Sequence, residues 1–369
     1  MTPLTTGKTL RSLRLKPSSA RWTRTMRSEI QALRPLAKPV GLLLLLGILL
    51  AAGCGQPQDS GATGGAGKKI TVALMPKSKG NAYFVSCKQG ADAAAKELGV
   101  ELLFDGPTDP DPAKQNEIIE NWITLGVDVI AAACENREGI STALRKAKAK
   151  GIRVLTYDSD SLPDARSFFV NQATPEGIGF GLMDEAARLL NEEGEFAIIT
   201  ASLTAGNMNE WRKHIEARLA SKYPKMKLAA IRPCDDLKDK AQSEATAILS
   251  AYPQVQLLMA ICSPAVPGAA EAVKQAGKGG KVKVIGLGLP SENRRYVKDG
   301  ITQSVILWKT TDLGYLTVHA AKSLVDGTLK PGATSYAAGR LGALEIQGDN
   351  VLLGKPFVFN ATNIDQFDF

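Results

Sequence analysis

Short apolar runs alternate with amphipathic segments along this chain from residue 69 to about residue 300. Several runs are apolar nearly throughout, as strands buried on both faces must be, so they predict parallel sheets covered by helices. Between the runs, apolar residues recur three or four positions apart, as in Trp211, Ile215 and Leu219, which is typical of helices that pack on a sheet. The expected strands are 70–75, 100–104, 127–133, 152–157, 196–200, 228–231, 255–261 and 282–285.

The number of these units predicts two doubly wound α/β domains with parallel sheets. Four strand and helix units precede residue 158, and about four more lie between residues 196 and 285. After Gly300 the pattern changes to a strand at 301–307, a helix at 312–325 and a hairpin at 343–353. We expect a first lobe of residues 68–170 plus 303–335 and a second lobe of residues 171–302 plus 336–369, joined by a multi-strand hinge.

Residues 34–54 (RPLAKPVGLLLLLGILLAAGC) have the order of a bacterial export signal. A basic flank precedes an apolar run that is shorter than the about 20 residues needed to span a bilayer, and small residues lead to Cys54. We therefore expect residues 1–53 to be a signal peptide, Cys54 to be lipidated and residues 54–67 to be a flexible tether. The protein would then be exported to the periplasm or the extracytoplasmic face of the membrane, touching the membrane only through its lipid anchor.

The formal net charge of +8 does not predict a nucleic-acid partner. Residues 1–39 hold nine of the 45 basic residues but only one of the 37 acidic residues, so 36 of each kind remain in the rest of the chain. Without a positive surplus, the mature protein has no general attraction for phosphate backbones.

Four cysteines follow Cys54, namely Cys87, Cys134, Cys234 and Cys262. They are too few for a disulfide scaffold in a chain of this size, and their pairing cannot be read from the sequence, although free buried thiols are the simpler interpretation. No two of them have the spacing of a metal site, so neither a metal nor a cofactor is expected.

Ligands of open parallel sheets bind beyond the carboxyl ends of the strands. The loops at those positions contain Lys, Asp, Asn, Ser and aromatic residues, which suit a hydroxyl-rich ligand because each sugar hydroxyl both donates and accepts. Asp158 can accept from two hydroxyls and Lys77 can donate, whereas a turn or cap role explains Asp160 better. The sequence therefore predicts a carbohydrate site.

Catalysis is not expected. Neither His214 nor His319 falls in a strand-end loop, where a base for a nucleophile would be needed. Asp158 and Asp160 would point in opposite directions on an extended segment, so they are unlike the paired carboxylates of a glycosidase. The glycine runs lack both the spacing of a dinucleotide loop and a Walker lysine.

Several long segments carry a family resemblance, including GNAYFVSCKQGADAAAKELGV, VLTYDSDSLPDARSFFVNQATPEGIG, GLGLPSENRRYVKDGI and VLLGKPFVFNATNIDQFDF. On these residues the chain resembles the periplasmic sugar-binding proteins of ABC importers, of the ribose-binding type, and among them the rhamnose-binding and autoinducer-2-binding branch. The resemblance implies a type I periplasmic binding protein, in which two Rossmann-like lobes joined by hinge strands close over a small carbohydrate. It also implies a monomer that delivers this ligand to a membrane permease.

The resemblance extends to the ligand contacts. Lys77 and Asp158 match ligand-contacting positions of the autoinducer-2 binders, whereas Asn207 and Met208 stand where those proteins have Asp and Gln. Met208 and Ile261 would cover a methyl group, which favours a deoxy sugar over ribose or galactose. We therefore expect a rhamnose-like deoxy sugar or an autoinducer-2-like ligand. The candidate ligand-binding residues are Lys77, Asn81, Tyr83, Phe84, Asp158, Asn207, Met208, Trp211, Cys262, Ser263, Gly288 and Trp308. The alternative function is a receptor that binds the same kind of ligand and docks onto a membrane sensor protein.

Overall fold

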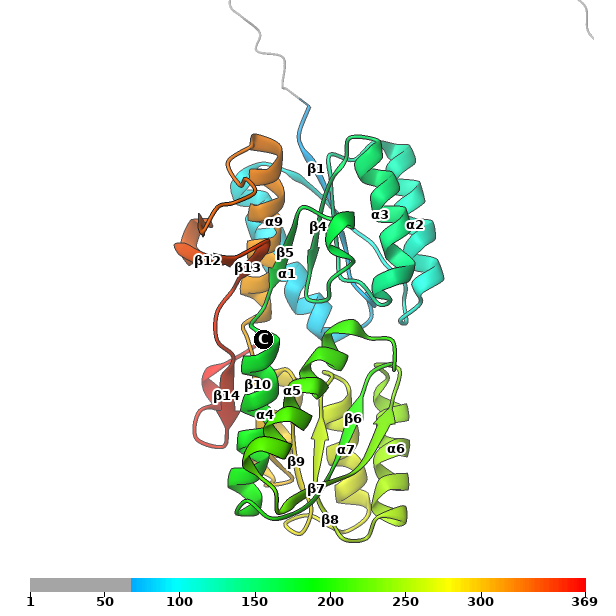
Figure 1. Cartoon of the computed structure of the whole chain (residues 1–369), viewed down its shortest axis with the longest axis vertical. Helices are drawn as coiled ribbons and strands as arrows, with labels where there is room; N and C mark the ends of the chain where they lie inside the picture. Colours follow the sequence, from blue (N-terminus) through cyan, green and yellow to red (C-terminus); the bar gives the residue numbers. More distant parts are fainter. Residues whose placement is uncertain (1–67) are drawn as a thin grey trace, which may run out of the picture. The chain divides into compact units, whose positions relative to one another are not determined.

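The first of two sheets contains the strands expected in the first half of the chain. The computed structural model describes residues 68–369 (Figure 1), so the expected signal peptide, tether and lipidated Cys54 lie outside the described residues. The strand order of this sheet is β11-β12-β13-β5-β4-β3-β1-β2, with β11 and β12 antiparallel to their neighbours and the rest parallel. The strands are β1 (Thr71–Met75), β2 (Glu101–Phe104), β3 (Val129–Ala132), β4 (Arg153–Tyr157), β5 (Phe168–Asn171), β11 (Ser335–Ala337), β12 (Ala343–Gln347) and β13 (Asn350–Leu352).

Helices cover both faces of this sheet, and together with it they form what we call the first lobe. They are α1 (Ala82–Leu98), α2 (Pro112–Leu125), α3 (Arg137–Ala149) and α9 (Thr310–Asp326). Alternate residues of β1 serve the two faces: Val72 and Leu74 join the core under α1 and α9, and Ala73 and Met75 join the core under α2 and α3. In Figure 1, α2 and α3 lie side by side over one flank of the sheet. All four of these β1 side chains are buried, which explains why the strand is apolar after Thr71.

The helices begin and end where the sequence supplies caps. The side chain of Asn81 accepts a hydrogen bond from the backbone of Tyr83 at the start of α1, and Asp111 caps α2 with a proline in its first turn. Gly99 and Gly126 end these two helices in the left-handed conformation, which glycine adopts without strain.

The second lobe, as we call it, is built from the second sheet and the helices around it. The strand order is β14-β10-β9-β8-β6-β7, and only the edge strand β14 is antiparallel to its neighbour. The strands are β6 (Gly194–Thr200), β7 (Met226–Pro233), β8 (Val255–Ala260), β9 (Lys283–Gly286), β10 (Thr302–Leu307) and β14 (Phe357–Asn360). The helices are α4 (Pro175–Leu190), α5 (Gly206–Lys222), α6 (Lys238–Ala251), α7 (Ala265–Gln275) and α8 (Pro290–Lys298), of which α4 packs on α5 and α6 on α7. The expected α/β class with two mostly parallel sheets is confirmed.

The chain passes between the lobes three times, from β5 to α4, from β10 to α9 and from β13 to β14. The boundaries expected after residue 300 are wrong in two places. Residues 303–307 belong to the second lobe because β10 pairs with β9, and residues 336–352 belong to the first lobe because β13 pairs with β5. Strands β5, β11 and β14 were not expected from the sequence.

Two glycines allow α1 and α9 to touch backbone to backbone. A Cβ atom on Gly90 would lie 1.7 Å from the carbonyl oxygen of Thr311, and a Cβ atom on Gly314 would lie 1.8 Å from that of Cys87. No other residue fits at either position without moving a helix.

No helix among the described residues combines the length and the low polarity needed to cross a membrane.

Candidate functional site

A cavity of about 30 Å³ lies between the two lobes, at the carboxyl ends of both sheets. The loops that follow β1 and β4 close it from the first lobe, and the start of α5 and the ends of β8, β9 and β10 close it from the second. Its walls are Lys77, Asn81, Tyr83, Phe84, Asp158, Asn207, Met208, Trp211, Asp236, Ile261, Cys262, Ser263, Leu287, Leu307 and Trp308. This is the place where open parallel sheets bind ligands.

A chain of hydrogen bonds organises the polar wall of the cavity, from Trp308 in the segment after β10 to two residues of the first lobe. Trp308 Nε1 donates to the hydroxyl of Tyr83 at 2.8 Å, and this hydroxyl donates to Asp158 Oδ1 at 2.8 Å. Asp158 follows β4 with a backbone φ of 59°, a left-handed conformation that aspartate tolerates better than most residues. The two bonds fix the orientation of the Tyr83 hydroxyl and of the Asp158 carboxylate. The second oxygen of Asp158 stays available for a ligand hydroxyl.

Burial and opposite charges determine how the polar wall is ionised. Burial raises the pKa of Asp158 to about 6, although the charge of Lys77 and the bond from Tyr83 act in the opposite direction. Burial also raises the pKa of Asp236 and of Glu135. For Lys77, burial lowers the pKa, but the three nearby carboxylates outweigh it and the pKa is raised overall. Lys77 is therefore a charged donor inside an acidic cluster.

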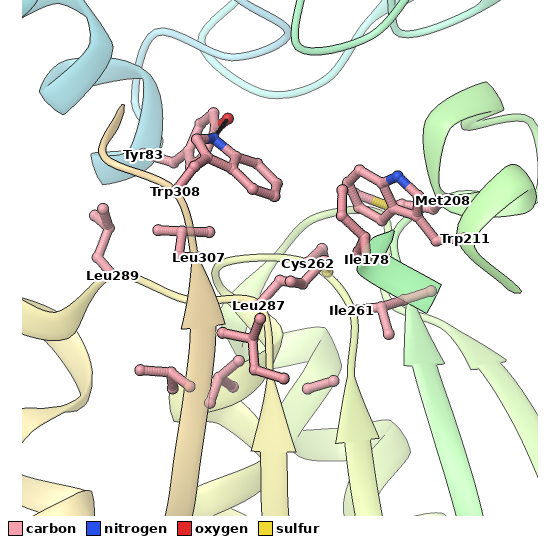
Figure 2. Close-up of a cluster of buried hydrophobic side chains, with 14 of the residues drawn as sticks. Tyr83, Ile178, Met208, Trp211, Ile261, Cys262, Leu287, Leu289, Leu307 and Trp308 are labelled. Atoms are coloured by element: carbon pink, nitrogen blue, oxygen red, sulfur yellow. Dashed lines mark hydrogen bonds between the residues drawn. The ribbon is translucent and has the colours of Figure 1, made fainter. Parts of the chain in front are cut away.

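Part of the cavity wall is apolar. Met208 and Trp211 lie three residues apart on the first turns of α5 and so face the same way, as Figure 2 shows. Ile261 and Leu287 come from the loops after β8 and β9, beneath them. The ring of Trp211 lies 6.1 Å from that of Trp308, at an angle of 60°. The cavity thus offers both hydrogen-bonding groups and hydrocarbon surface.

Four hydrogen bonds cross directly from one lobe to the other around the cavity, one of them from Asn207 Nδ2 to the backbone oxygen of Asp158 at 3.5 Å. Lys77 Nζ donates to Asn207 Oδ1 at 3.1 Å, and Asn81 Nδ2 donates to Asp236 Oδ2 at 3.2 Å. The hydroxyl of Ser202 donates to Glu135 Oε1 at 3.0 Å. The lobes are closed over the cavity, and the groups that would bind a ligand hold one another.

The structure brings together eleven of the twelve candidate residues, since all but Gly288 line the cavity. Gly288 instead packs behind the wall, where a Cβ atom would lie 2.7 Å from the side-chain nitrogen of Asn293 and 3.2 Å from Val266. The interpretation of Asp160 as a structural residue fits its contacts, because its carboxylate accepts two hydrogen bonds from Arg166. Asp160 lines a neighbouring cavity of about 350 Å³ that shares Asp158, Asn207 and Trp211 with the first.

Sequence reasoning missed Asp236, Leu287 and Leu307 as wall residues. Asp236 stands in the loop after β7, a strand that had been expected, so reading that loop as the others were read would have found it. Leu287 and Leu307 are apolar residues at strand ends and carry no signal that separates them from the core.

Among the described residues, no group of three or more histidine, cysteine or acidic side chains is placed to hold a metal ion. The four cysteines after Cys54 are buried free thiols, and of these only Cys262 lines the cavity.

Comparisons with known proteins agree with this geometry. Residues 72–329 match the family described as periplasmic binding protein domain. The D-allose-binding periplasmic protein of Escherichia coli K12 is 29% identical over 265 residues, which cover 68% of this chain and 84% of that protein.

Two solved structures are similar over nearly their whole length. LsrB from Clostridium saccharobutylicum in complex with AI-2 aligns with a TM-score of 0.78 and 26% identity, covering 81% of this chain and 100% of that one. An ABC transporter solute binding protein from Clostridium phytofermentas with bound L-rhamnose aligns with a TM-score of 0.77 and 32% identity, covering 81% of this chain and 98% of that one.

Proposed function

The chain belongs to the periplasmic binding protein family, and from this premise we propose that it is the sugar-binding component of an ABC importer that captures a small deoxy sugar between its lobes. Like its relatives, it is a binding protein and not an enzyme. Relatives that include a ribose import binding protein of Bacillus subtilis support the general proposal that the chain delivers a small carbohydrate to a permease.

The mixture of charged and apolar residues in the cavity wall is the reason for proposing a deoxy sugar. Lys77, Asp158 and Asp236 offer charged partners to ring hydroxyls, and a hydrogen bond to a charged group contributes about 1.5 to 3 kcal/mol. Met208 and Ile261 offer no hydrogen-bonding side chain, so a hydroxyl buried against them would lose about 1 to 3 kcal/mol. A methyl group at the same place would gain about 0.8 kcal/mol from burial.

Ligand capture requires the lobes to separate and close again. A cavity of about 30 Å³ holds two or three water molecules, at about 10 to 15 Å³ each, which is less than a monosaccharide needs. The bond from Lys77 to Asn207 would be replaced by bonds from both side chains to ligand hydroxyls. Because each lobe supplies part of the site, a ligand binds the closed form better and shifts the hinge equilibrium toward it.

Matched sugar pairs test this proposal by titration calorimetry. L-rhamnose and L-fucose differ from L-mannose and L-galactose only by the 6-hydroxyl, so we expect the deoxy member of at least one pair to bind tenfold or more tightly. Equal or tighter binding of the 6-hydroxy sugars would contradict the deoxy-sugar proposal. If no sugar of a panel that also contains ribose, allose, arabinose and AI-2 bound, the import function itself would be wrong.

A second part of the proposal concerns the attachment to the membrane. Cys54 follows an apolar run and small residues in the order of a lipidation signal. A Gly-rich segment separates it from the first lobe. We expect the wild-type chain to fractionate with membranes and Cys54→Ala to lose the lipid. Equal membrane association and equal mass of the two forms would exclude the anchor.

A further inference from the structure

Two cysteines from separate loops meet beside the cavity. Cys234 follows β7 and Cys262 follows β8, two strands that lie on opposite sides of β6 in the second sheet. Their sulfur atoms are 3.5 Å apart, and the two residues are 0% and 2% exposed. The two loops thus place their thiols in van der Waals contact across the end of the strand between them.

We propose that Cys234 and Cys262 form a disulfide that fastens the second lobe's wall of the cavity. An S–S bond of about 2 Å needs the sulfurs to approach by about 1.5 Å, a movement within reach of side-chain rotation. A metal does not explain the pair, because the described residues contain no third ligand suitably placed beside it. The other two cysteines after Cys54, Cys87 and Cys134, belong to the first lobe.

The chemistry is thiol–disulfide exchange with an oxidised dithiol protein or a small disulfide. The thiolate of one cysteine attacks a sulfur of the oxidant, which forms a mixed disulfide and releases one thiol of the oxidant. The thiolate of the second cysteine then attacks the first cysteine's sulfur and releases the other thiol. The protein loses two protons and two electrons, and the oxidant's disulfide gains both. Extracytoplasmic compartments, where members of this family such as the D-allose-binding protein act, supply such oxidants.

Access to the pair runs through the cavity. Cys262 lines the cavity wall, so separation of the lobes exposes it, whereas Cys234 lies behind it. Burial raises the pKa of the Cys262 thiol well above its ordinary value, which slows exchange in the closed form. Oxidation should therefore take place during folding or in the open form.

The bond would also alter the cavity. Asp236, which also lines the cavity, accepts a hydrogen bond from Asn81 of the other lobe, and its charge contributes to the raised pKa of the Cys262 thiol. A sulfur bonded to Cys234 has no proton, so the cavity wall would carry no titratable thiol near Asp236.

Peptide mapping of the full chain tests the proposal directly. The purified protein is equilibrated with glutathione disulfide, unfolded, alkylated without reductant and digested with trypsin. Cys234 and Cys262 are the single cysteines of the tryptic peptides 228–238 and 241–274. We expect these two peptides to be linked and the peptides of Cys87 and Cys134 to be alkylated. Full alkylation of Cys234 and Cys262, or a link to another cysteine, would overturn the proposal.

Thermal unfolding gives a second readout. A disulfide closing a loop of this length should raise the melting temperature by roughly 5 °C, so reductant should lower it by that amount. Cys234→Ala should melt at the same temperature with and without reductant. Cys134→Ala, a matched change of a buried thiol in the first lobe, should keep the full response. An equal response of wild type and Cys234→Ala would count against the bond.

Discussion

Lys77 of the first lobe donates a hydrogen bond to Asn207 of the second lobe at 3.1 Å, across the cavity that separates them. Lys77 is only 2% exposed and is surrounded by the carboxylates of Asp158, Asp236 and Glu135. The closed form is therefore stabilised by the same side chains that are available to a ligand. Closure and binding draw on one set of donors and acceptors.

Replacing Asn207 by alanine should shift the ligand-free protein toward the open form. A hydrogen bond from a charged group contributes about 1.5 kcal/mol, so the ratio of closed to open molecules should fall roughly tenfold. Small-angle scattering would show the larger radius of gyration. Asn209→Ala is the matched control on the same helix, because the Asn209 amide donates to Leu203 within the second lobe. Equal scattering curves for both variants would show that the bond does not hold the lobes.

The contribution of Asp158 to the stability of the folded protein should fall as the pH rises from about 4 to about 6. Burial raises the pKa of Asp158 to about 6, whereas an aspartate in the unfolded chain titrates near 3.9. The folded state therefore binds the proton of Asp158 more tightly than the unfolded state does. This tighter binding contributes at most about 3 kcal/mol to the free energy of unfolding, which is present below pH 4 and lost above pH 6.

Urea unfolding of wild type and Asp158→Asn across this range measures the effect. Both proteins contain the other titrating carboxyl groups, of which Glu135 and Asp236 have raised pKa values and Asp184 and Glu185 have lowered ones. The difference between the two proteins in how the free energy of unfolding changes with pH therefore measures the contribution of Asp158. Parallel curves would mean that Asp158 is not perturbed. The same variant should bind L-rhamnose at least tenfold more weakly than wild type, while Asp92→Asn on the exposed face of α1 should bind normally.

Gly90→Ala should destabilise the protein by about 3 kcal/mol. The added Cβ would lie 1.7 Å from the carbonyl oxygen of Thr311, so α1 and α9 must move apart. Gly181→Ala is the control, because this helical glycine has open space around its Cβ position and alanine should stabilise α4 by about 0.5 to 1 kcal/mol. Chemical unfolding compares the two. A similar midpoint for both variants would refute the close helix contact.

Ligand binding should change the fluorescence of Trp211 and Trp308, which line the cavity. Trp122 lies in the separate core under α2 and α3, away from the site. Addition of L-rhamnose should therefore change the emission of wild type and of Trp122→Phe equally, and the change should shrink in Trp211→Phe and Trp308→Phe. A signal that disappears only in Trp122→Phe would place the ligand elsewhere.

The α/β framework can be predicted from the sequence because burial on both sheet faces leaves a strong pattern. The apolar run at β1 and the helix caps Asn81 and Asp111 are local signals, and they locate elements to within a few residues. The lobe assignment after residue 300 could not be predicted in the same way. Whether β10 joins β9 or β13 joins β5 depends on pairing between distant segments, and no local pattern records it.

The residues of the candidate site likewise divide into those that could be predicted from the sequence and those that could not. Polar residues in strand-end loops, such as Lys77 and Asp158, could be predicted because parallel sheets align those loops at one edge. Leu307 could not, since an apolar residue at a strand end has the same composition signal whether it faces a cavity or a core. Gly288 was placed in the site by its loop, and the structure shows that the residue faces Asn293 instead.

The contact between α1 and α9 joins the beginning of the folded region to a helix encoded after nearly all of the second lobe. During synthesis, α1 has no partner for its Gly90 surface until residues 310–326 have emerged from the ribosome. The strands β6 to β10, by contrast, follow one another along the chain and can assemble earlier. The first lobe of a nascent polypeptide of this design therefore stays incomplete until translation is almost finished.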